Sequence, residues 1–145
     1  MPAGYAAHGT LFQVSDMAAT PVWTTVANVS DISGPEYTRD TIDVTSHSST
    51  GGYKEYINGL KDGGNVTFDL LYIGDATQTT ITDLYESGDV NDFRIKMPIT
   101  DTGVDNQIDF SGIVTTVGAA FPLGDAIKRS VTIKVTGPAT WSEAA

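Results

Sequence analysis

The alternation of apolar and polar positions along this chain predicts a fold built mainly of β-strands. The clearest alternation covers residues 65–73, where Val66, Phe68 and Leu70 share one face. Residues 127–136 alternate equally cleanly, which indicates an antiparallel strand with one buried face. Gly112 interrupts another strand pattern and marks a bulge or a close approach of two backbones. Further strands are expected at residues 9–15, 41–45, 93–99 and 108–117, with a strand and turn inside residues 22–32.

One segment, residues 75–87, has the periodicity of a helix. Asp75 is expected to cap its N-terminus, Gln78 lies at the spacing of a capping box, and Gly88 supplies the stop. The apolar stripe that would lie against a sheet consists of Ile81, Leu84 and Tyr85. The predicted fold class is therefore mainly β, a β-sandwich or barrel with one flanking α-helix.

The whole chain, residues 1–145, is expected to form a single domain with flexible termini and a long protruding loop at about residues 46–64. After residue 136 we expect a short tail that contains Trp141. The connection over residues 41–64 is far longer than the usual connection of about 4 to 6 residues. A long connection without its own secondary structure is usually functional or disordered, and we interpret this one as a contact arm.

The composition of this arm indicates a protein partner. Its five glycines are interpreted as hinges, and its charged residues alternate in sign between apolar ones. Exposed apolar groups on a flexible arm usually mark a protein partner, and burial in that partner offsets the entropy lost on ordering. The candidate inter-subunit residues are His47, Tyr53, Lys54, Glu55, Tyr56, Ile57, Leu60, Lys61 and Asp62.

The net charge narrows the possible partners. Eighteen acidic residues stand against eight basic ones, a net charge of −10. Proteins that bind duplex DNA usually neutralise its phosphates with clustered Lys and Arg, and no such cluster occurs here. The chain also lacks a run of about 18 apolar residues that would span a bilayer, and its start lacks the pattern of a secretion signal. We therefore expect synthesis in the cytoplasm, no membrane partner and no stable binding to DNA.

The residues that could carry chemistry do not combine into a site. His47 lies near Asp43 and Ser46, but no Gly-x-Ser-x-Gly elbow holds a nucleophile, and a polar loop histidine is the favoured interpretation. A hydrolase is therefore disfavoured. With no cysteine and two histidines, a zinc site is also disfavoured, and the aspartates within residues 101–109 lack the spacing of a calcium-binding EF-hand loop. We predict no catalytic residue, no cofactor and no metal.

The run I-D-V-T-S-H-S-S-T-G-G-Y-K-E-Y-I-N-G-L-K-D-G-G-N-V-T-F, residues 42–68, resembles the major tail tube proteins of long-tailed, non-contractile bacteriophages. The early Gly-Thr-Leu-Phe and the Ile-Ser-Gly-Pro at residues 32–35 support the resemblance, which is strongest in the first half of the chain. It implies a β-sandwich with one flanking helix, assembled as hexameric rings that stack into a hollow tube for DNA ejection. The arm would then reach a neighbouring subunit or ring.

The resemblance also implies partners and a location. The partners would be further copies of the chain, the tape measure protein, the tail terminator and the tail-tip proteins, with transient, non-specific passage of DNA. The protein would reside in the virion after synthesis in the host cytoplasm. Asp43 and Asp69, on strands that flank the arm, are the possible lumen-facing acids. The alternatives are a tube subunit of a type VI secretion or related contractile-injection system, and an Ig-like adhesion module, which should carry an export signal.

Overall fold

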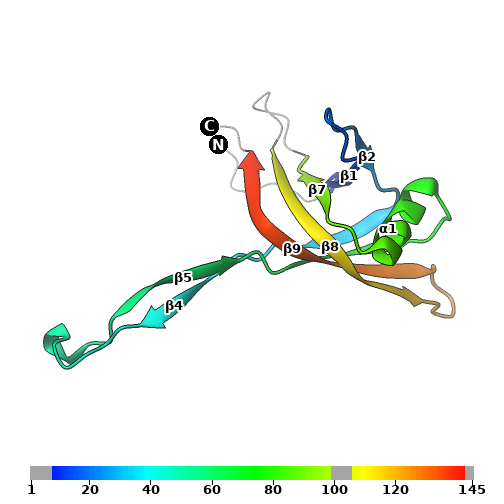
Figure 1. The fold of residues 1–145 in the computed structure, drawn as a ribbon. Helices are drawn as coiled ribbons and strands as arrows, with labels where there is room; N and C mark the ends of the chain where they lie inside the picture. Colours follow the sequence, from blue (N-terminus) through cyan, green and yellow to red (C-terminus); the bar gives the residue numbers. More distant parts are fainter. Residues whose placement is uncertain (1–7, 99–105, 143–145) are drawn as a thin grey trace.

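The computed structural model describes residues 8–98 and 106–142, which form a curled sheet, a helix across it and a projecting hairpin (Figure 1). The mainly β fold with one α-helix that the sequence predicts is confirmed. Residues 1–7 and 143–145, where flexible termini are expected, lie outside the described residues, as do Asp101 and Asp105. The elements are β1 (Leu11–Ser15), β2 (Trp23–Thr25), β3 (Val29–Ser33), β4 (Thr38–Asp43), the 3₁₀ turn η1 (Thr50–Gly52), β5 (Tyr56–Asp62), β6 (Asn65–Leu71), α1 (Ala76–Ser87), β7 (Asn91–Lys96), β8 (Gln107–Ala120) and β9 (Lys128–Ser142).

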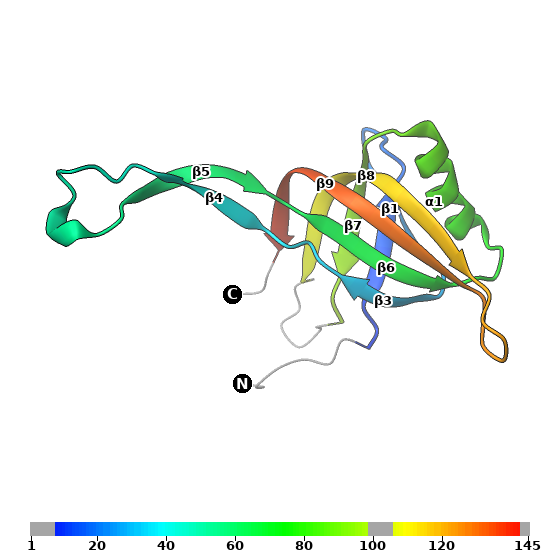
Figure 2. The same ribbon diagram turned by 90° about the horizontal axis from the view of Figure 1, so that it is seen from below.

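Seven of these strands form one sheet in the order β2-β1-β7-β8-β9-β6-β3. Every neighbouring pair in it is antiparallel. β8 and β9 are the longest strands and cross the middle of the sheet, as Figure 2 shows. The remaining two strands, β4 and β5, pair with each other and form a separate sheet.

The sheet curls around its own apolar face. Alternation along β6 buries Val66, Phe68 and Leu70 on one side. Phe68 also contacts Phe12 of β1, with ring centroids 4.3 Å apart, although β7, β8 and β9 separate these two strands in the sheet. A flat sheet would keep β1 and β6 apart by four strand spacings of about 4.8 Å each. The strands therefore form a barrel-like half-cylinder with an aromatic core.

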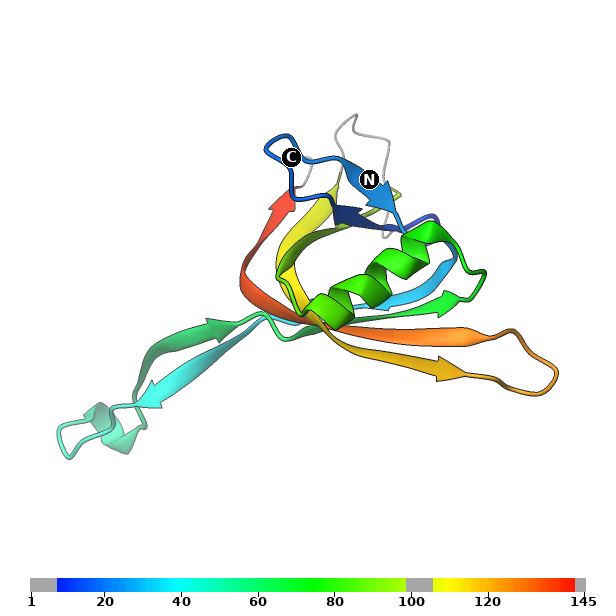
Figure 3. The same cartoon turned by 45° about the vertical axis from the view of Figure 1, so that its right-hand side comes forward.

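Helix α1 lies across the open side of the curled sheet (Figure 3). Asp75 caps it as predicted: its side chain accepts a hydrogen bond from the Thr77 backbone N–H at 3.1 Å. Gly88 ends it with a left-handed φ of 70°. Ile81 is fully buried and Leu84 packs against the core, but Tyr85 is 45 % exposed. The predicted apolar stripe is therefore correct for its first two members and wrong for Tyr85, which faces solvent.

Gln78 does not form the predicted capping box. Its side chain is 1 % exposed and donates hydrogen bonds of 3.0 Å to the carbonyls of Ala27 and Leu71. Its Oε1 also accepts a bond from the Ile73 backbone N–H at 3.2 Å. These three backbone groups lie at strand ends that the helix covers. Because buried polar groups need a hydrogen-bond partner, the Gln78 amide takes the place of water.

β9 is longer than its sequence pattern predicts. Gly137 and Pro138 resemble a strand end, yet the strand continues to Ser142, so that Trp141 belongs to β9 and not to a tail. Gly137 has a φ of +75°, and the register with β8 shifts between Asp109 and Ser111. A bulge on β9 absorbs these two residues and lets pairing resume beyond it.

Candidate assembly interface

The segment interpreted as an arm without secondary structure is a β-hairpin, so that interpretation is wrong in this respect. β4 pairs with β5 in antiparallel register, with Ile42 opposite Ile57 and Asp43 opposite Tyr56. The strand expected at residues 41–45 overlaps β4, but the sequence does not reveal its partner β5. Both faces of a two-stranded ribbon are exposed, which removes the apolar alternation that marks a half-buried strand. The two strands pair the backbone groups on their facing edges, so the arm has regular secondary structure of its own.

Backbone pairing continues toward the tip of this hairpin, residues 38–62. Val44 N–H donates to the Glu55 carbonyl at 2.9 Å, and Glu55 N–H donates to the Thr45 hydroxyl at 2.8 Å. Ser46, Ser48 and Ser49 make short-range bonds within the tip, and Gly51 turns the chain with a φ of 68°. The serines around His47 thus stabilise the turn at the tip.

The hairpin carries apolar side chains that the body does not cover. Leu60 is 85 % exposed and Tyr53 is 77 % exposed. Tyr56 and Ile57 are each about half exposed, as is Ile42 on the opposite strand. A soluble monomer rarely shows so many large apolar groups on one projection, and such a surface usually marks a protein contact.

The root of the hairpin is pinned to β9. Asp62 accepts a hydrogen bond from Gly64 N–H and lies 3.3 Å from the Lys134 ammonium, and these contacts hold the pKa of its carboxyl below the ordinary value. A Cβ at position 63 would lie 2.6 Å from Val135, and Gly64 has a φ of +66°. The sequence analysis interpreted these two glycines as hinges. In the structure they let the backbone pass close to β9, and this close approach sets the direction in which the hairpin projects.

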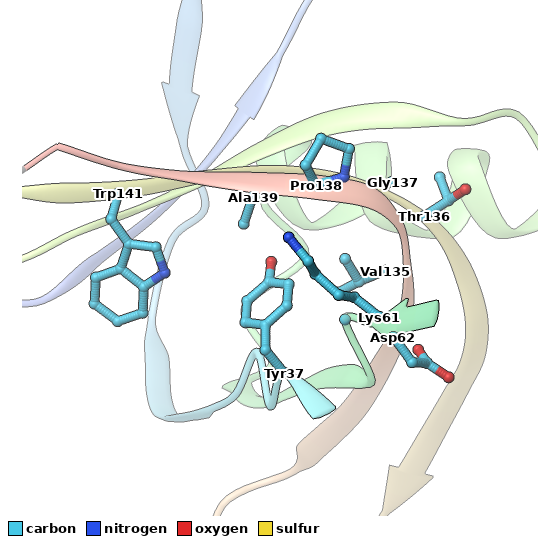
Figure 4. Close-up of a pocket in the computed structure, with 10 residues that line it drawn as sticks. Tyr37, Lys61, Asp62, Val135, Thr136, Gly137, Pro138, Ala139 and Trp141 are labelled. Carbon is cyan, nitrogen blue, oxygen red and sulfur yellow. The ribbon is translucent and has the colours of Figure 1, made fainter. Parts of the chain in front are cut away.

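A cleft of about 600 Å³ opens beside this root (Figure 4). Tyr37, just before β4, and Trp141 of β9 line it, and Lys61 extends its side chain along it. Burial raises the pKa of the Tyr37 hydroxyl. Two of the predicted arm residues, Lys61 and Asp62, therefore lie at the cleft, whereas His47, Tyr53, Lys54 and Glu55 lie at the far end of the hairpin.

The two acids predicted to face a lumen lie on different sheets. Asp69 is on β6 between two core residues, so its side chain points to the outer, polar face of the seven-stranded sheet, where Ser130 is its neighbour on β9. Asp43 ends β4 on the hairpin. Its carboxylate accepts a bond from Thr45 N–H, and the contacts with Thr45 lower its pKa.

A second exposed apolar area lies at the opposite end of the sheet from the hairpin, and it was not predicted from the sequence. We call it the distal patch. Tyr72 N–H donates to the Ile127 carbonyl, which joins the end of β6 to the start of β9, and a cleft of about 340 Å³ lies between their side chains and Phe121. Phe121 and Leu123 sit in a Pro- and Gly-containing turn, which resembles an ordinary polar loop. The distal patch consists of Tyr72, Ile73, Phe121, Leu123 and Ile127, with exposures from 41 % to 105 %.

Within residues 8–98 and 106–142, no three or more His, Asp or Glu side chains come together as a metal site. The same residues contain no helix that is long and apolar enough to cross a membrane. What the described surface does offer is apolar contact area on a projecting hairpin and at the far end of the sheet.

The sequence model of the family described as "Lambda phage tail tube protein, TTP" matches residues 5–142. The chain belongs to this family. The resemblance to phage tail tube proteins is thereby confirmed, and so is the expected location in the phage tail. A search of curated protein sequences found no match.

Solved structures share the fold of this tail tube protein at low sequence identity. A subunit from the tail of an empty gene transfer agent particle with C6 symmetry matches with a TM-score of 0.77 and 17 % identity, covering 97 % of this chain and 100 % of that one. A subunit of the SPP1 tail tube matches at 0.67 and 14 %, covering 88 % and 73 %. A chain of the sheath–tube complex of a PVC extracellular contractile injection system matches at 0.70 and 14 %, covering 98 % and 93 %.

Proposed function

We propose that this tail tube protein assembles into hexameric rings that stack into the hollow tube of a long, non-contractile phage tail, through which DNA is ejected. The observation that carries the proposal is the ordered hairpin, which projects from the body with uncovered side chains at Tyr53, Tyr56 and Leu60. Burial of this apolar surface on a neighbouring copy would stabilise the contact by about 25 cal/mol per Å² of buried area. The role is structural, without catalysis, cofactor or membrane contact.

The nine predicted arm residues keep their assignment as the inter-subunit or inter-ring contact under this proposal. Those at the outer end of the hairpin would touch the neighbour directly, and Lys61 and Asp62 would act at the root. The partners expected from the family are the tape measure protein inside the tube, the tail terminator at one end and the tail-tip proteins at the other.

Asp43 and Asp69 remain proposed lumen-facing acids. Six copies with a net charge of −10 would give a ring a formal charge of −60. At physiological salt, exposed charges are screened within about 8 Å, so repulsion would act near the wall and would let DNA pass without sticking. The polar outer face of the seven-stranded sheet, which carries Asp69, supports the assignment for that residue.

A tube subunit of a contractile-injection system is the alternative, favoured by the similarity to the PVC sheath–tube chain. Such a tube is enclosed by a sheath, whereas the tube of a non-contractile tail is not. Electron micrographs of particles from the producing cell distinguish the two: a bare flexible tail supports the main proposal, and a sheathed, contracting tail supports the alternative.

Replacing apolar hairpin side chains tests the assembly proposal. In the Tyr56→Ser/Leu60→Ser variant, both substitutions lie on β5 at exposed positions, so the body should fold unchanged. The unmodified protein at high concentration should form tubes with six-fold end views in negative-stain micrographs, and the variant should form at least about tenfold fewer, because each lost apolar contact costs about 1–2 kcal/mol.

Val22→Ser is the matched control, because Val22 is 61 % exposed beside β2, away from the hairpin. It should assemble like the unmodified protein. Equal tube formation by the hairpin variant and the control would remove the hairpin's proposed role, and the absence of any tube from the unmodified protein would refute the proposed function itself.

A further inference from the structure

The hairpin and the distal patch lie at opposite ends of the molecule. β6 begins directly after the hairpin root and ends directly before Tyr72. Its seven residues span about 23 Å at about 3.3 Å per residue. The hairpin points away from the sheet on one side, and the turn between β8 and β9 extends on the other (Figures 1 and 2). A copy of the chain therefore cannot cover its own distal patch with its own hairpin.

Two different apolar surfaces at opposite ends suit a head-to-tail contact between copies. A contact between unlike surfaces leaves one of each open at the ends of the pair, and it continues into a ring or a helical stack. A contact of the hairpin with a second hairpin would instead close a two-fold dimer and would leave the distal patch uncovered.

The charges around the two surfaces are complementary. On the outer half of the hairpin, Asp43 and Glu55 outnumber Lys54. Beside the distal patch lie the cations Lys128 and Arg129 and the acids Asp75 and Asp125, and Asp125 lies 3.6 Å from the Lys128 ammonium. The Arg129 guanidinium lies 5.9 Å from the centre of the Tyr72 ring and lines the cleft of the patch. The acids of the hairpin thus have a group of opposite charge, Arg129, at the cleft of the patch.

The cleft has room for an aromatic side chain. Its volume of about 340 Å³ lies within the range of about 300–1,000 Å³ that is typical of ligand pockets. Tyr53 is the most exposed aromatic side chain at the end of the hairpin, and Leu123 is fully exposed on the turn that borders the cleft.

From these observations we propose that the outer half of the hairpin of one copy docks on the distal patch of the next. The Tyr53 end packs against Phe121 and Leu123, and Arg129 faces Asp43 and Glu55. Under this pairing Asp43 lies at the contact between copies, so Asp69 alone remains the proposed lumen-facing acid. The inference rests on the proposed self-assembly and adds the surface that receives the hairpin. It makes the turn between β8 and β9 a contact element.

Engineered cysteines test this pairing cleanly, because the chain has none of its own. The Thr50→Cys/Ala126→Cys variant places one thiol at the end of the hairpin and one on the turn between β8 and β9, both at exposed positions whose side chains the proposed contact does not use. After assembly and treatment with a short bismaleimide crosslinker, a head-to-tail contact should give a ladder of covalent oligomers beyond the dimer on a denaturing gel. Each single-cysteine variant should stop at the dimer.

Thr50→Cys/Tyr85→Cys is the matched control, since Tyr85 is a half-exposed residue of α1 that belongs to neither proposed surface. It should give no ladder. Tubes of the test variant without a ladder, or an equal ladder in the control, would overturn the pairing while the tubes themselves uphold the proposed function. No tubes from the cysteine-free protein would instead refute the proposed function.

A charge exchange provides a second measurement. Arg129→Glu should slow tube growth at low salt by about tenfold or more, because like charges across a contact are strongly unfavourable. Adding Asp43→Arg and Glu55→Arg to that variant should restore most of the rate. Restoration supports the pairing, and an unchanged or further reduced rate in the combined variant, with a native circular dichroism spectrum, contradicts it.

Discussion

Gln78 is the polar side chain on which the helix and two strand ends depend. Its amide holds the carbonyls of Ala27 and Leu71 and the N–H of Ile73, so three backbone groups that no strand pairs are satisfied by one buried residue. Thr77 adds a bond from the Ala27 N–H to its hydroxyl. A polar residue at this position therefore acts as part of the core.

Gln78→Ala should lower the free energy of unfolding by about 2–4 kcal/mol, since it leaves three buried backbone groups without partners. Urea denaturation followed by circular dichroism measures the loss. Glu86→Ala, at an exposed position of the same helix, should change stability by less than about 0.5 kcal/mol. Equal effects of the two substitutions would show that the buried amide has no special role.

Asp75 should make stability depend on pH. Hydrogen bonds from the Thr77 hydroxyl and backbone N–H hold the pKa of its carboxyl below 3.8, the ordinary value. The stabilisation is therefore fully present above that ordinary pKa and is lost as the pH falls through the lower, folded value.

Asp75→Asn keeps the capping oxygen and removes the charge. The variant should be slightly less stable than the unmodified protein at neutral pH, and the gap should close in acid, as measured by urea midpoints from about pH 6 to pH 2. A gap that is constant over this range would mean that the charge of Asp75 does not contribute.

Glycines within strands show how elements approach one another in this fold. Gly112 lies in β8 where a Cβ would come within 2.5 Å of Ile133 Cγ2 and 2.8 Å of the Lys134 carbonyl oxygen. The predicted close approach at this position is therefore confirmed. Gly118, on the same strand, would place its Cβ 3.8 Å from the Ser130 carbonyl oxygen, an ordinary contact distance.

Gly112→Ala should lower the free energy of unfolding by about 1–3 kcal/mol, because the methyl group must displace a core side chain and a neighbouring strand. Gly118→Ala should have little effect or stabilise slightly, since it fits and reduces the freedom of the unfolded chain. The midpoints of thermal unfolding of the two variants are compared. Equal midpoints would contradict the close packing of Gly112 against β9.

At the scale of the whole molecule, charge and shape act together. The net charge of −10 makes separate copies repel one another, while the apolar hairpin and the distal patch favour contact between them. Screening over about 8 Å confines the repulsion to close approach, so assembly and DNA passage are compatible with the same acidic surface.

Tubes of the Asp69→Lys variant should retain duplex DNA that tubes of the unmodified protein release, because the substitution would place a ring of cations on the proposed lumen wall. Asp89→Lys changes the net charge equally at an exposed position after α1 and should not retain DNA. Co-sedimentation of labelled DNA with tubes measures retention. If both variants retain DNA equally, the retention depends on the total charge of the tube, and the proposed lumen position of Asp69 is contradicted.

Local pattern was sufficient to predict most of the fold. The structure confirms the alternation in β6 and β9, the N-cap at Asp75 and the helix end at Gly88. These features depend on residues that are close in sequence. The resemblance over residues 42–68 likewise indicated the family. The burial of Gln78 and the continuation of β9 past Gly137 depend on partners distant in sequence, and so local pattern predicted both incorrectly.

The sequence by itself determined the mainly β class, the single helix, the acidic surface and the segment that projects, since each follows from residue type and short-range order. Only the tertiary structure decided that this segment is a paired hairpin, that the sheet curls until Phe12 meets Phe68, and that Tyr72 and Phe121 share one surface. The physical reason is that strand pairing and sheet curvature join residues that are far apart along the chain.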